Sequence, residues 1–302
     1  MPSEIEQVIM KFNYEYHKLL ESTEYSVGKS FLWYVDKVKS LRFIDILSRF
    51  KERTQYKKLK DVYGEDFATI DADNTPLRIG EDCKKSFTVY TCITGNYESP
   101  KTPFVIPSNY NFVLFSDTIK LCEGWNVRPI PDELKKYDNS EINRYIKFHP
   151  ASFFDTDYSL YVDGNVKLVA GISSFLDINV CECGLWMFDH PSRNCIYQEA
   201  DACMKIRKGN KIGIVNQIIR YQKEGMPRNY GLKEATVIFT DLKNHLAISL
   251  LNEWWREYYL SSSKRDQLAL PYILWRNGIT VDQIGNLGAN VRSDMHFIIS
   301  SH

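Results

Sequence analysis

Apolar residues recur at helical spacing over the first part of the chain. From residue 3 to residue 64 they fall three or four positions apart, with one break near residues 21–28. This spacing puts them on one face of a helix, so the pattern predicts a helical N-terminal segment. Residues 65–85 are polar and rich in turn formers, and we interpret them as a linker. We therefore assign residues 1–80 to a helical extension and residues 81–302 to the main domain.

The pattern changes at residue 86, where short runs of β-forming residues begin. These predicted strands occupy residues 86–94, 111–117, 125–130 and 158–169. Helical patterns lie between or after them, around residues 138–148 and over residues 210–225 and 244–260. Strands that alternate with helices indicate an α/β fold built on one sheet.

Polar residues follow three of these strands directly. Gly95-Asn96 ends the first, Ser116-Asp117 ends the second, and Asp163-Gly164-Asn165 interrupts the last apolar run. In open α/β sheets, ligands bind outside the carboxyl ends of the strands. The sequence therefore predicts a ligand site that brings these three segments together.

Charge and cysteine content narrow the class of protein. Lys plus Arg and Asp plus Glu each number 38, so nothing points to a nucleic-acid partner. The basic run at 51–60 fits a membrane surface or simply a solvated helix face. Seven cysteines without paired Cys-x-x-Cys spacing favour reduced thiols, and the start of the chain lacks a signal-peptide pattern. We predict a cytoplasmic protein, with possible contact at the inner face of the membrane.

Asp163 is the strongest candidate for metal binding. A strand-end carboxylate before a glycine suits Mn²⁺ or Mg²⁺, which prefer oxygen ligands and share them with substrate phosphates. Asn165 stands where a second acid of an Asp-x-Asp motif would lie, and its amide oxygen can also bind a cation. The alternative is a β-hairpin turn, because Asp-Gly is a strong turn signal. A histidine such as His296 is a candidate third ligand, although a lone histidine is more often structural.

Two basic residues lie three positions apart in the predicted helix at 138–148. Arg144 and Lys147 would share a helix face, where two cations suit a diphosphate. The alternative is a solvated face on which these cations pair with Glu141 or Asp138.

An ordered set of segments resembles a glycosyltransferase family that includes bacterial capsule and O-antigen enzymes and plant cell-wall proteins. The segments are YTCITGNYE (90–98), LFSD (114–117), RYIKFHPASFFDTDYSLYVDGNVK (144–167), FDHPSRNCIYQEADA (188–202), LLNEWW (250–255) and RDQL (265–268). They cover about residues 86–280. The resemblance implies a GT-A-type fold, with a Rossmann-like mixed sheet flanked by helices, and a metal-dependent nucleotide-sugar site.

The resemblance also implies roles for individual residues. Asp163 would bind the metal, and Asp117 would accept a hydrogen bond from the base, which we expect to be uracil. The acids expected near the reacting carbon are Asp266 and Glu199. The residues expected to contact the nucleotide sugar are Thr91, Gly95, Asn96, Tyr97, Arg144, Lys147, His190 and Arg193.

Asp266 has a second interpretation. It follows an aromatic helix with Trp254 and Trp255, and a carboxylate in an aromatic pocket can have a raised pKa. The alternative is a helix N-terminus after Ser261-Ser262-Ser263, where an acid serves as a cap.

The predicted function is transfer of a hexosyl unit from a UDP-sugar to a bacterial surface polysaccharide, with retention favoured. Its partners would be the UDP-sugar donor and an oligosaccharide or lipid-linked glycan acceptor, and further glycosyltransferase domains or a homo-oligomer are possible. Two alternatives remain open. One is a non-catalytic carbohydrate-binding or scaffolding module, and the other is a metal-dependent nucleotidyltransferase.

Overall fold

A computed structural model describes residues 76–80, 83–178 and 181–300, together with Tyr14, Lys18 and Ser22. Most of the predicted helical extension at 1–80 lies outside these residues, as does the basic run at 51–60. Residues 77–79 fall within the predicted linker but form a strand, β1, which pairs in parallel with β3. That pairing attaches the end of the predicted linker to the main domain.

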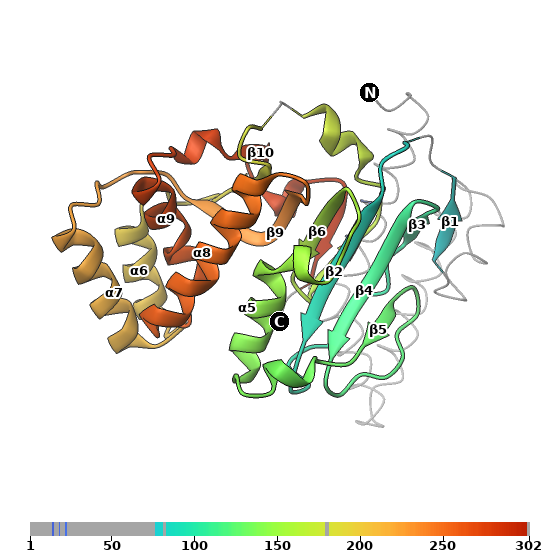
Figure 1. The fold of residues 1–302 in the computed structure, drawn as a ribbon, viewed down its shortest axis with the longest axis horizontal. Helices are drawn as coiled ribbons and strands as arrows, with labels where there is room; N and C mark the ends of the chain where they lie inside the picture. Colours follow the sequence, from blue (N-terminus) through green and yellow to red (C-terminus); the bar gives the residue numbers. More distant parts are fainter. Residues whose placement is uncertain are drawn as a thin grey trace, which may run out of the picture.

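The centre of the fold is a seven-stranded sheet, with the strands in the order β10-β8-β9-β6-β2-β4-β5 (Figure 1). Its strands are β2 (Phe87–Ile93), β4 (Tyr110–Ser116), β5 (Asn126–Arg128), β6 (Tyr158–Val162), β8 (Leu185–Asp189), β9 (Lys233–Asp241) and β10 (Gly285–Gly288). Two further strand pairs lie outside this sheet within the described residues. β1 (Leu77–Ile79) pairs in parallel with β3 (Val105–Pro107), and β7 (Val166–Leu168) pairs antiparallel with β11 (Phe297–Ile299).

The sheet is parallel except at β9, which runs antiparallel to both of its neighbours, β6 and β8. Within the described residues, this mixed sheet with helices against it is the predicted GT-A-type architecture, so the fold class is confirmed. Because β9 is reversed, its first residues lie at the edge where the parallel strands end. The pairing of β8 with β9 also skips from Met187↔Ile238 to Phe188↔Glu234, a large bulge at that same edge.

The helices lie on one side of the sheet (Figure 1). They are α5 (Asn139–Phe148), α6 (Ile196–Lys205), α7 (Lys211–Lys223), α8 (His245–Ser261) and α9 (Leu270–Arg276), and a 3₁₀ turn, η4 (Asp266–Leu268), connects α8 with α9. The outermost helix, α7, packs on α6 and α8 (Figure 1). The three helices predicted from the sequence correspond to α5, α7 and α8. The opposite face is buried under β7, β11 and the 3₁₀ turn η3 (Ser173–Asp177).

The sequence dictates where the site-bearing helix α5 begins. Asp138 caps it by accepting from the Glu141 N–H, and Glu141 accepts from the Asp138 N–H in return. This capping box satisfies two N–H groups that the first helical turn leaves free. Ile142 and Ile146 lie one turn apart, and both are buried in the core, as is Phe148 at the end of the helix. The cap and the apolar stripe together set which face of α5 turns inward.

All seven cysteines fall within the described residues and are free thiols, as the predicted reduced state requires. No helix in the described ranges is long and apolar enough to cross a membrane.

Packing between β8 and β10 provides a test of the sheet edge. A Cβ on Gly285 would lie 2.0 Å from Cδ1 of Trp186. We expect Gly285→Ala to lower the free energy of unfolding by about 1–3 kcal/mol, because the extra methyl overpacks a filled contact. Urea unfolding followed by circular dichroism measures this change.

Gly80→Ala is the matched control, because a Cβ there meets no atom of the described residues within 4 Å. Its effect should stay within about 0.5 kcal/mol. Equal stability of the two variants would contradict the described contact between β10 and Trp186.

Candidate functional site

The loops after β2 and β4 are joined at the edge where parallel strands end. The Gly95 N–H donates to the Asp117 carboxylate, at 3.0 and 3.2 Å from its two oxygens. Gly95 has φ +63°, and a Cβ there would lie 2.4 Å from Nδ2 of Asn139 at the start of α5. The left-handed φ favours glycine, and a larger residue would also have to displace the Asn139 side chain. Asn96 is also left-handed, with φ 54°.

Two other residues predicted to contact the nucleotide differ in exposure. Thr91 lies within β2 and is buried, whereas the Tyr97 side chain is 79% exposed. The structure therefore brings Gly95, Asn96 and Asp117 together and leaves Tyr97 open to a ligand.

Asp163 follows β6 in a tight turn. The Val166 N–H donates to the Asp163 carbonyl at 3.0 Å. The turn is not that of a hairpin, because β6 pairs with β2 and β9 while β7 pairs with β11. The Asp163 side chain is 35% exposed, so its carboxylate remains accessible. A turn and a ligand site therefore coexist at this position.

Helix α5 brings two cations into the site. Lys147 is buried, and its Nζ lies 2.9 Å from Oδ2 of Asp266 and 3.9 Å from Oδ1 of Asp163. The Nε of Arg144 lies 2.9 Å from the same Asp266 oxygen. One carboxylate thus holds both cations, and Lys147 connects it to Asp163.

The solvated-face alternative for these cations is wrong. Asp138 and Glu141, its expected partners, each pair instead with Lys264 at 2.7 Å. Arg144 and Lys147 lie on the side of α5 that faces Asp266, so the helix presents its two cations inward.

The raised pKa expected for Asp266 is also wrong. Burial alone would raise the pKa of this carboxyl, but Arg144, Lys147 and Arg265 together hold it well below its ordinary value. Trp254 contributes a hydrogen bond from its indole N–H to the Asp266 backbone carbonyl, at 2.8 Å. The aromatic helix therefore positions the Asp266 backbone, and the three cations keep the Asp266 carboxyl in its charged form.

A second buried carboxylate, Glu199, lies on α6. Its Oε2 is 2.6 Å from Nε of Arg193 and 3.5 Å from Nε2 of His190. Its Oε1 is 3.7 Å from a guanidinium nitrogen of Arg265. Three of the predicted residues therefore form one cluster, and Arg265 joins it to Asp266.

His190 is neutral near pH 7. Burial lowers its pKa; Glu199 opposes that shift, and Arg193 adds to it. Its Nδ1 accepts the backbone N–H groups of Ser192 and Arg193, at 3.2 and 3.1 Å. The ring thus organises the loop after β8 rather than supplying a charge.

Asn165 and His296 lie at opposite ends of the β7–β11 ladder. Asn165 is buried, its amide N–H donates to the Ser300 carbonyl, and its own carbonyl accepts the Ser300 N–H. The His296 carbonyl instead accepts the Val169 N–H, and its ring contacts Asp294 and Ser174 at 2.8 and 3.1 Å. The structure therefore does not bring His296 to Asp163. Within the described residues, no three His, Cys, Asp or Glu side chains form a metal-binding group.

Sequence reasoning missed Glu234, near the start of β9. Its Oε1 accepts the Thr236 hydroxyl at 3.0 Å, whereas its Oε2 is enclosed and has no hydrogen-bond partner among the residues that the structure describes. Its charge also acts on the pKa of His190. A search for ligand-binding residues that directly follow each strand does not include the first residues of a strand. Glu234 reaches the site because β9 is reversed, and a carboxylate inside an apolar run was the one available signal.

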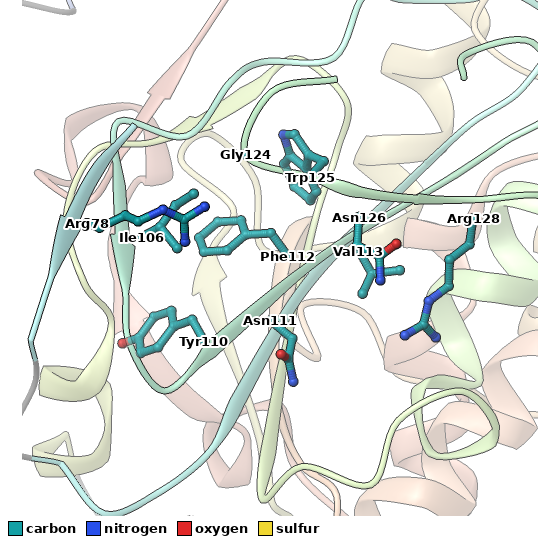
Figure 2. Close-up of a pocket in the computed structure, with 10 residues that line it drawn as sticks. All are labelled: Arg78, Ile106, Tyr110, Asn111, Phe112, Val113, Gly124, Trp125, Asn126 and Arg128. Carbon is teal, nitrogen blue, oxygen red and sulfur yellow. The ribbon is translucent and has the colours of Figure 1, made fainter. Parts of the chain in front are cut away.

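A cavity of about 440 Å³ lies elsewhere, at the β4–β5 edge (Figure 2). Its lining includes Tyr110, Phe112 and Trp125 together with Arg78 and Arg128. It borders the first half of β4, whereas Asp117 follows the end of that strand. None of the predicted site residues lines it.

More than half of the chain matches a known protein family. Residues 135–290 match the TOD1/MUCI70, glycosyltransferase-like domain, and they make up more than half of the chain. The chain belongs to this family of glycosyltransferase-like proteins. No similar sequence was found among curated proteins.

Solved structures with some similarity are glycosyltransferases by name. The apo bifunctional glycosyltransferase WbbM has a TM-score of 0.42 and 11% identity, over 70% of this chain and 40% of that one. Apo GlyE of Streptococcus pneumoniae TIGR4 has a TM-score of 0.36 and 11% identity, over 68% of this chain and 45% of that one. The galactosyltransferase LgtC, in complex with donor and acceptor sugar analogs, has a TM-score of 0.37 and 17% identity, over 68% of this chain and 74% of that one. The chain thus spans less than half the length of the first two.

The ion pairs of Asp266 give a test of the site's architecture. We expect Asp266→Asn to lower the free energy of unfolding at pH 7 by about 3–5 kcal/mol, because two buried cations lose their partner. The wild-type carboxylate binds its proton more weakly when folded, so its stabilising effect is lost as the pH falls below about 4. The wild type should therefore lose up to about 1.4 kcal/mol more per pH unit there than the variant.

Urea titrations at several pH values measure both effects. Asp282→Asn, at an exposed position in a 3₁₀ turn, is the control and should follow the wild type. A wild-type stability that is no steeper with pH than that of Asp266→Asn would refute the depressed pKa.

Proposed function

We propose that the protein transfers a hexosyl unit from a UDP-sugar to a glycan acceptor. One observation carries the proposal. In a member of a glycosyltransferase-like family, an accessible strand-end carboxylate, Asp163, lies 3.9 Å from the buried cation Lys147, beside the loops that hold Gly95 and Asp117. Carboxylate, cation and backbone turn are the groups that a nucleoside diphosphate sugar needs at one edge of a sheet.

In this proposal the nucleoside binds over the loop after β2. Asn96 and Tyr97 present a left-handed backbone and an exposed ring, which suit a flat base and its ribose. Asp117 already accepts the Gly95 N–H, and its carboxylate has further acceptor capacity for a base N–H. A uracil N–H is the donor we expect there.

The donor set fits a divalent cation shared with the substrate. Mg²⁺ is commonly held by one or two carboxylates plus substrate phosphates, and Asp163 supplies one accessible carboxylate. Asn165 is engaged with Ser300, so we assign it to holding the turn. When bound, Mn²⁺ or Mg²⁺ would offset the negative charge that develops on the leaving diphosphate.

The reaction breaks the bond between the anomeric carbon and the UDP oxygen and forms a bond to an acceptor hydroxyl oxygen, whose proton is released. Lys147 and Arg144 stabilise the departing UDP by their charge. Asp266 keeps both cations oriented, so we assign it a positioning role. Glu199 orients Arg193 and Arg265 in the same way.

Glu234 is the carboxylate that we assign to the donor sugar. One oxygen of its carboxylate has no hydrogen bond among the described residues, at a cost of about 1–3 kcal/mol, and we assign a sugar hydroxyl as its donor, which requires the groups that enclose this oxygen to move apart. The bulge between β8 and β9 places it beside the Asp163 turn, because the Asp163 N–H donates to the Thr236 carbonyl.

The proposed acceptor is an oligosaccharide or lipid-linked glycan of a bacterial surface polysaccharide, and the proposed location is the cytoplasm. The ordered sequence segments that resemble capsule and O-antigen enzymes support the acceptor and favour retention of anomeric configuration. The cysteine pattern supports the location. Proton NMR of the product, run early in the reaction, distinguishes retention from inversion by the anomeric coupling constant.

The role of Asp163 can be tested by calorimetric titration with UDP. We expect Mn²⁺ to strengthen UDP binding to the wild type, and Asp163→Asn to remove most of that gain, because the neutral amide is a weaker ligand for a hard cation. Asp282→Asn, an acid exposed elsewhere on the chain, should retain it.

The titration combined with turnover assays separates the other functions. UDP binding without turnover of any UDP-sugar would favour a carbohydrate-binding or scaffolding module. Turnover that releases pyrophosphate from a nucleoside triphosphate would favour a nucleotidyltransferase. An undiminished metal effect in Asp163→Asn would remove Asp163 from the metal site.

Glu234→Gln tests the sugar contact separately from the nucleotide contact. We expect UDP affinity to be unchanged and transfer from UDP-sugar to fall by at least about tenfold, since a charged hydrogen bond to substrate contributes roughly 1.5–3 kcal/mol. Stability should stay equal or rise, because the enclosed oxygen then belongs to a neutral amide and no longer to a charged carboxylate. Loss of stability together with loss of UDP binding would instead assign Glu234 to the fold.

A further inference from the structure

Helix α7 carries an apolar stripe on the side that faces away from the domain. Ile212, Val215 and Ile219 are exposed by 74%, 37% and 44%. At about 100° per residue they fall within roughly 60° of one another around the helix axis. The opposite side of α7, with Ile214 and Tyr221, is buried. A surface helix normally turns polar residues outward, so α7 is apolar on both sides.

Unpaired cations surround this stripe. From residue 205 to residue 223 the chain has six basic residues and no acidic one. Lys205 pairs with Asp201, and Arg220 pairs with Glu257. Within the described residues, the other four cations have no acidic partner, and all are exposed: Arg207, Lys208, Lys211 and Lys223.

Lys211 adds to the positive charge at the start of α7. It is the first residue of α7, where the partial positive charge of the helix end already lies, and no acid occupies the first turn. A cation there is locally unfavourable. Ile206, which is 68% exposed, extends the apolar surface into the same loop.

We propose that this α7 face docks the protein on an anionic membrane surface. The α7 face comprises the exposed stripe of α7, Ile206 and the four unpaired cations. Interfacial helices bind by burying a modest apolar face while Lys and Arg contact anionic headgroups. Protein interfaces, in contrast, are depleted in Lys and enriched in aromatic residues, and the α7 face has three Lys and no aromatic residue.

The α7 face is joined directly to the charged cluster of the site. The Asn210 N–H donates to the Ser263 carbonyl, and a Cβ on Gly209 would lie 2.7 Å from Cγ of Arg265. Figure 1 shows α7 at the outer end of the helical side. Docking through α7 would therefore hold the Arg265–Asp266 segment close to lipid headgroups, where a lipid-linked acceptor would be presented. Only this last consequence rests on the proposed function.

Sedimentation with vesicles tests the docking without any nucleotide. At low salt we expect the full chain to bind equimolar phosphatidylglycerol and phosphatidylcholine vesicles, and not pure phosphatidylcholine. Combining Lys208→Gln with Lys211→Gln should lower the partition coefficient about 25-fold, because each cation near an anionic surface contributes about fivefold. Combining Ile212→Asn with Ile219→Asn should lower it at least about tenfold, through lost apolar burial.

Matched controls remove the same residue types elsewhere. Lys84→Gln with Lys136→Gln removes two exposed cations, and Leu121→Asn removes an apolar side chain that is 89% exposed. Both should bind vesicles as the wild type does. Circular dichroism and UDP titration of every variant confirm that the fold and the nucleotide site are intact.

Several results would overturn the proposal. They are absence of binding to anionic vesicles, equal binding to neutral ones, or equal losses in the controls. Unchanged vesicle binding in the α7 variants, with loss in Lys57→Gln combined with Lys58→Gln, would assign the contact to the basic run at 51–60. A self-association in ultracentrifugation that only the isoleucine variants abolish, without an effect on vesicles, would make the α7 face a protein interface.

Discussion

The candidate site depends on one buried carboxylate that holds two cations. Asp266 lies 2.9 Å from both Lys147 and Arg144, and all three side chains are largely removed from water. Buried charges of this kind are costly unless each is paired with good geometry. The pairing joins α5 to the turn between α8 and α9, two segments more than a hundred residues apart in sequence. Any ligand at Asp163 meets a cation, Lys147, whose position this pairing has already set.

A second constraint comes from the reversed strand β9. It splits from β8 at the bulge and carries Glu234 to the edge where the parallel strands end. The two flanking clusters, around Asp266 and Glu199, meet at Arg265. Asp266 and Glu199 are engaged in close ion pairs at this edge, whereas Asp117, Asp163 and Glu234 keep acceptor capacity for a ligand. That capacity separates these three acids from the residues that hold the site together.

Much of the fold could be predicted from the sequence, because local signals were strong. Apolar runs with polar ends predicted β2, β4 and β6, and helical spacing predicted α5, α7 and α8. The loops at Gly95 and Asp117 also meet as strand order suggested. The strand at 77–79 was missed because three residues carry no periodicity, and their partner β3 is equally short.

The charges of the site were harder to predict. Sequence spacing put Arg144 and Lys147 on one helix face but could not tell which way that face turns. The answer depends on Asp266, more than a hundred residues later, and on the capping acids being taken by Lys264. The expected pKa of Asp266 was wrong for the same reason. Its aromatic neighbours are close in sequence, whereas two of the cations that lower its pKa, Arg144 and Lys147, are more than a hundred residues away. The sequence could not exclude His296 as a metal ligand, because the direction of β11, which carries this residue away from Asp163, depends on tertiary pairing.

The ladder between β7 and β11 gives the turn at Asp163 a natural reporter. Asn165 exchanges two hydrogen bonds with Ser300, and only three residue pairs continue the ladder beyond it. So short a ladder opens locally at low cost, and its amides then exchange with solvent. Loosening of the turn that carries Asp163 would move Asn165 and free the Ser300 amide. Its deuterium uptake therefore reads out, from the far side of the sheet, how rigidly the turn is held, and a ligand that tightens the turn would slow that uptake.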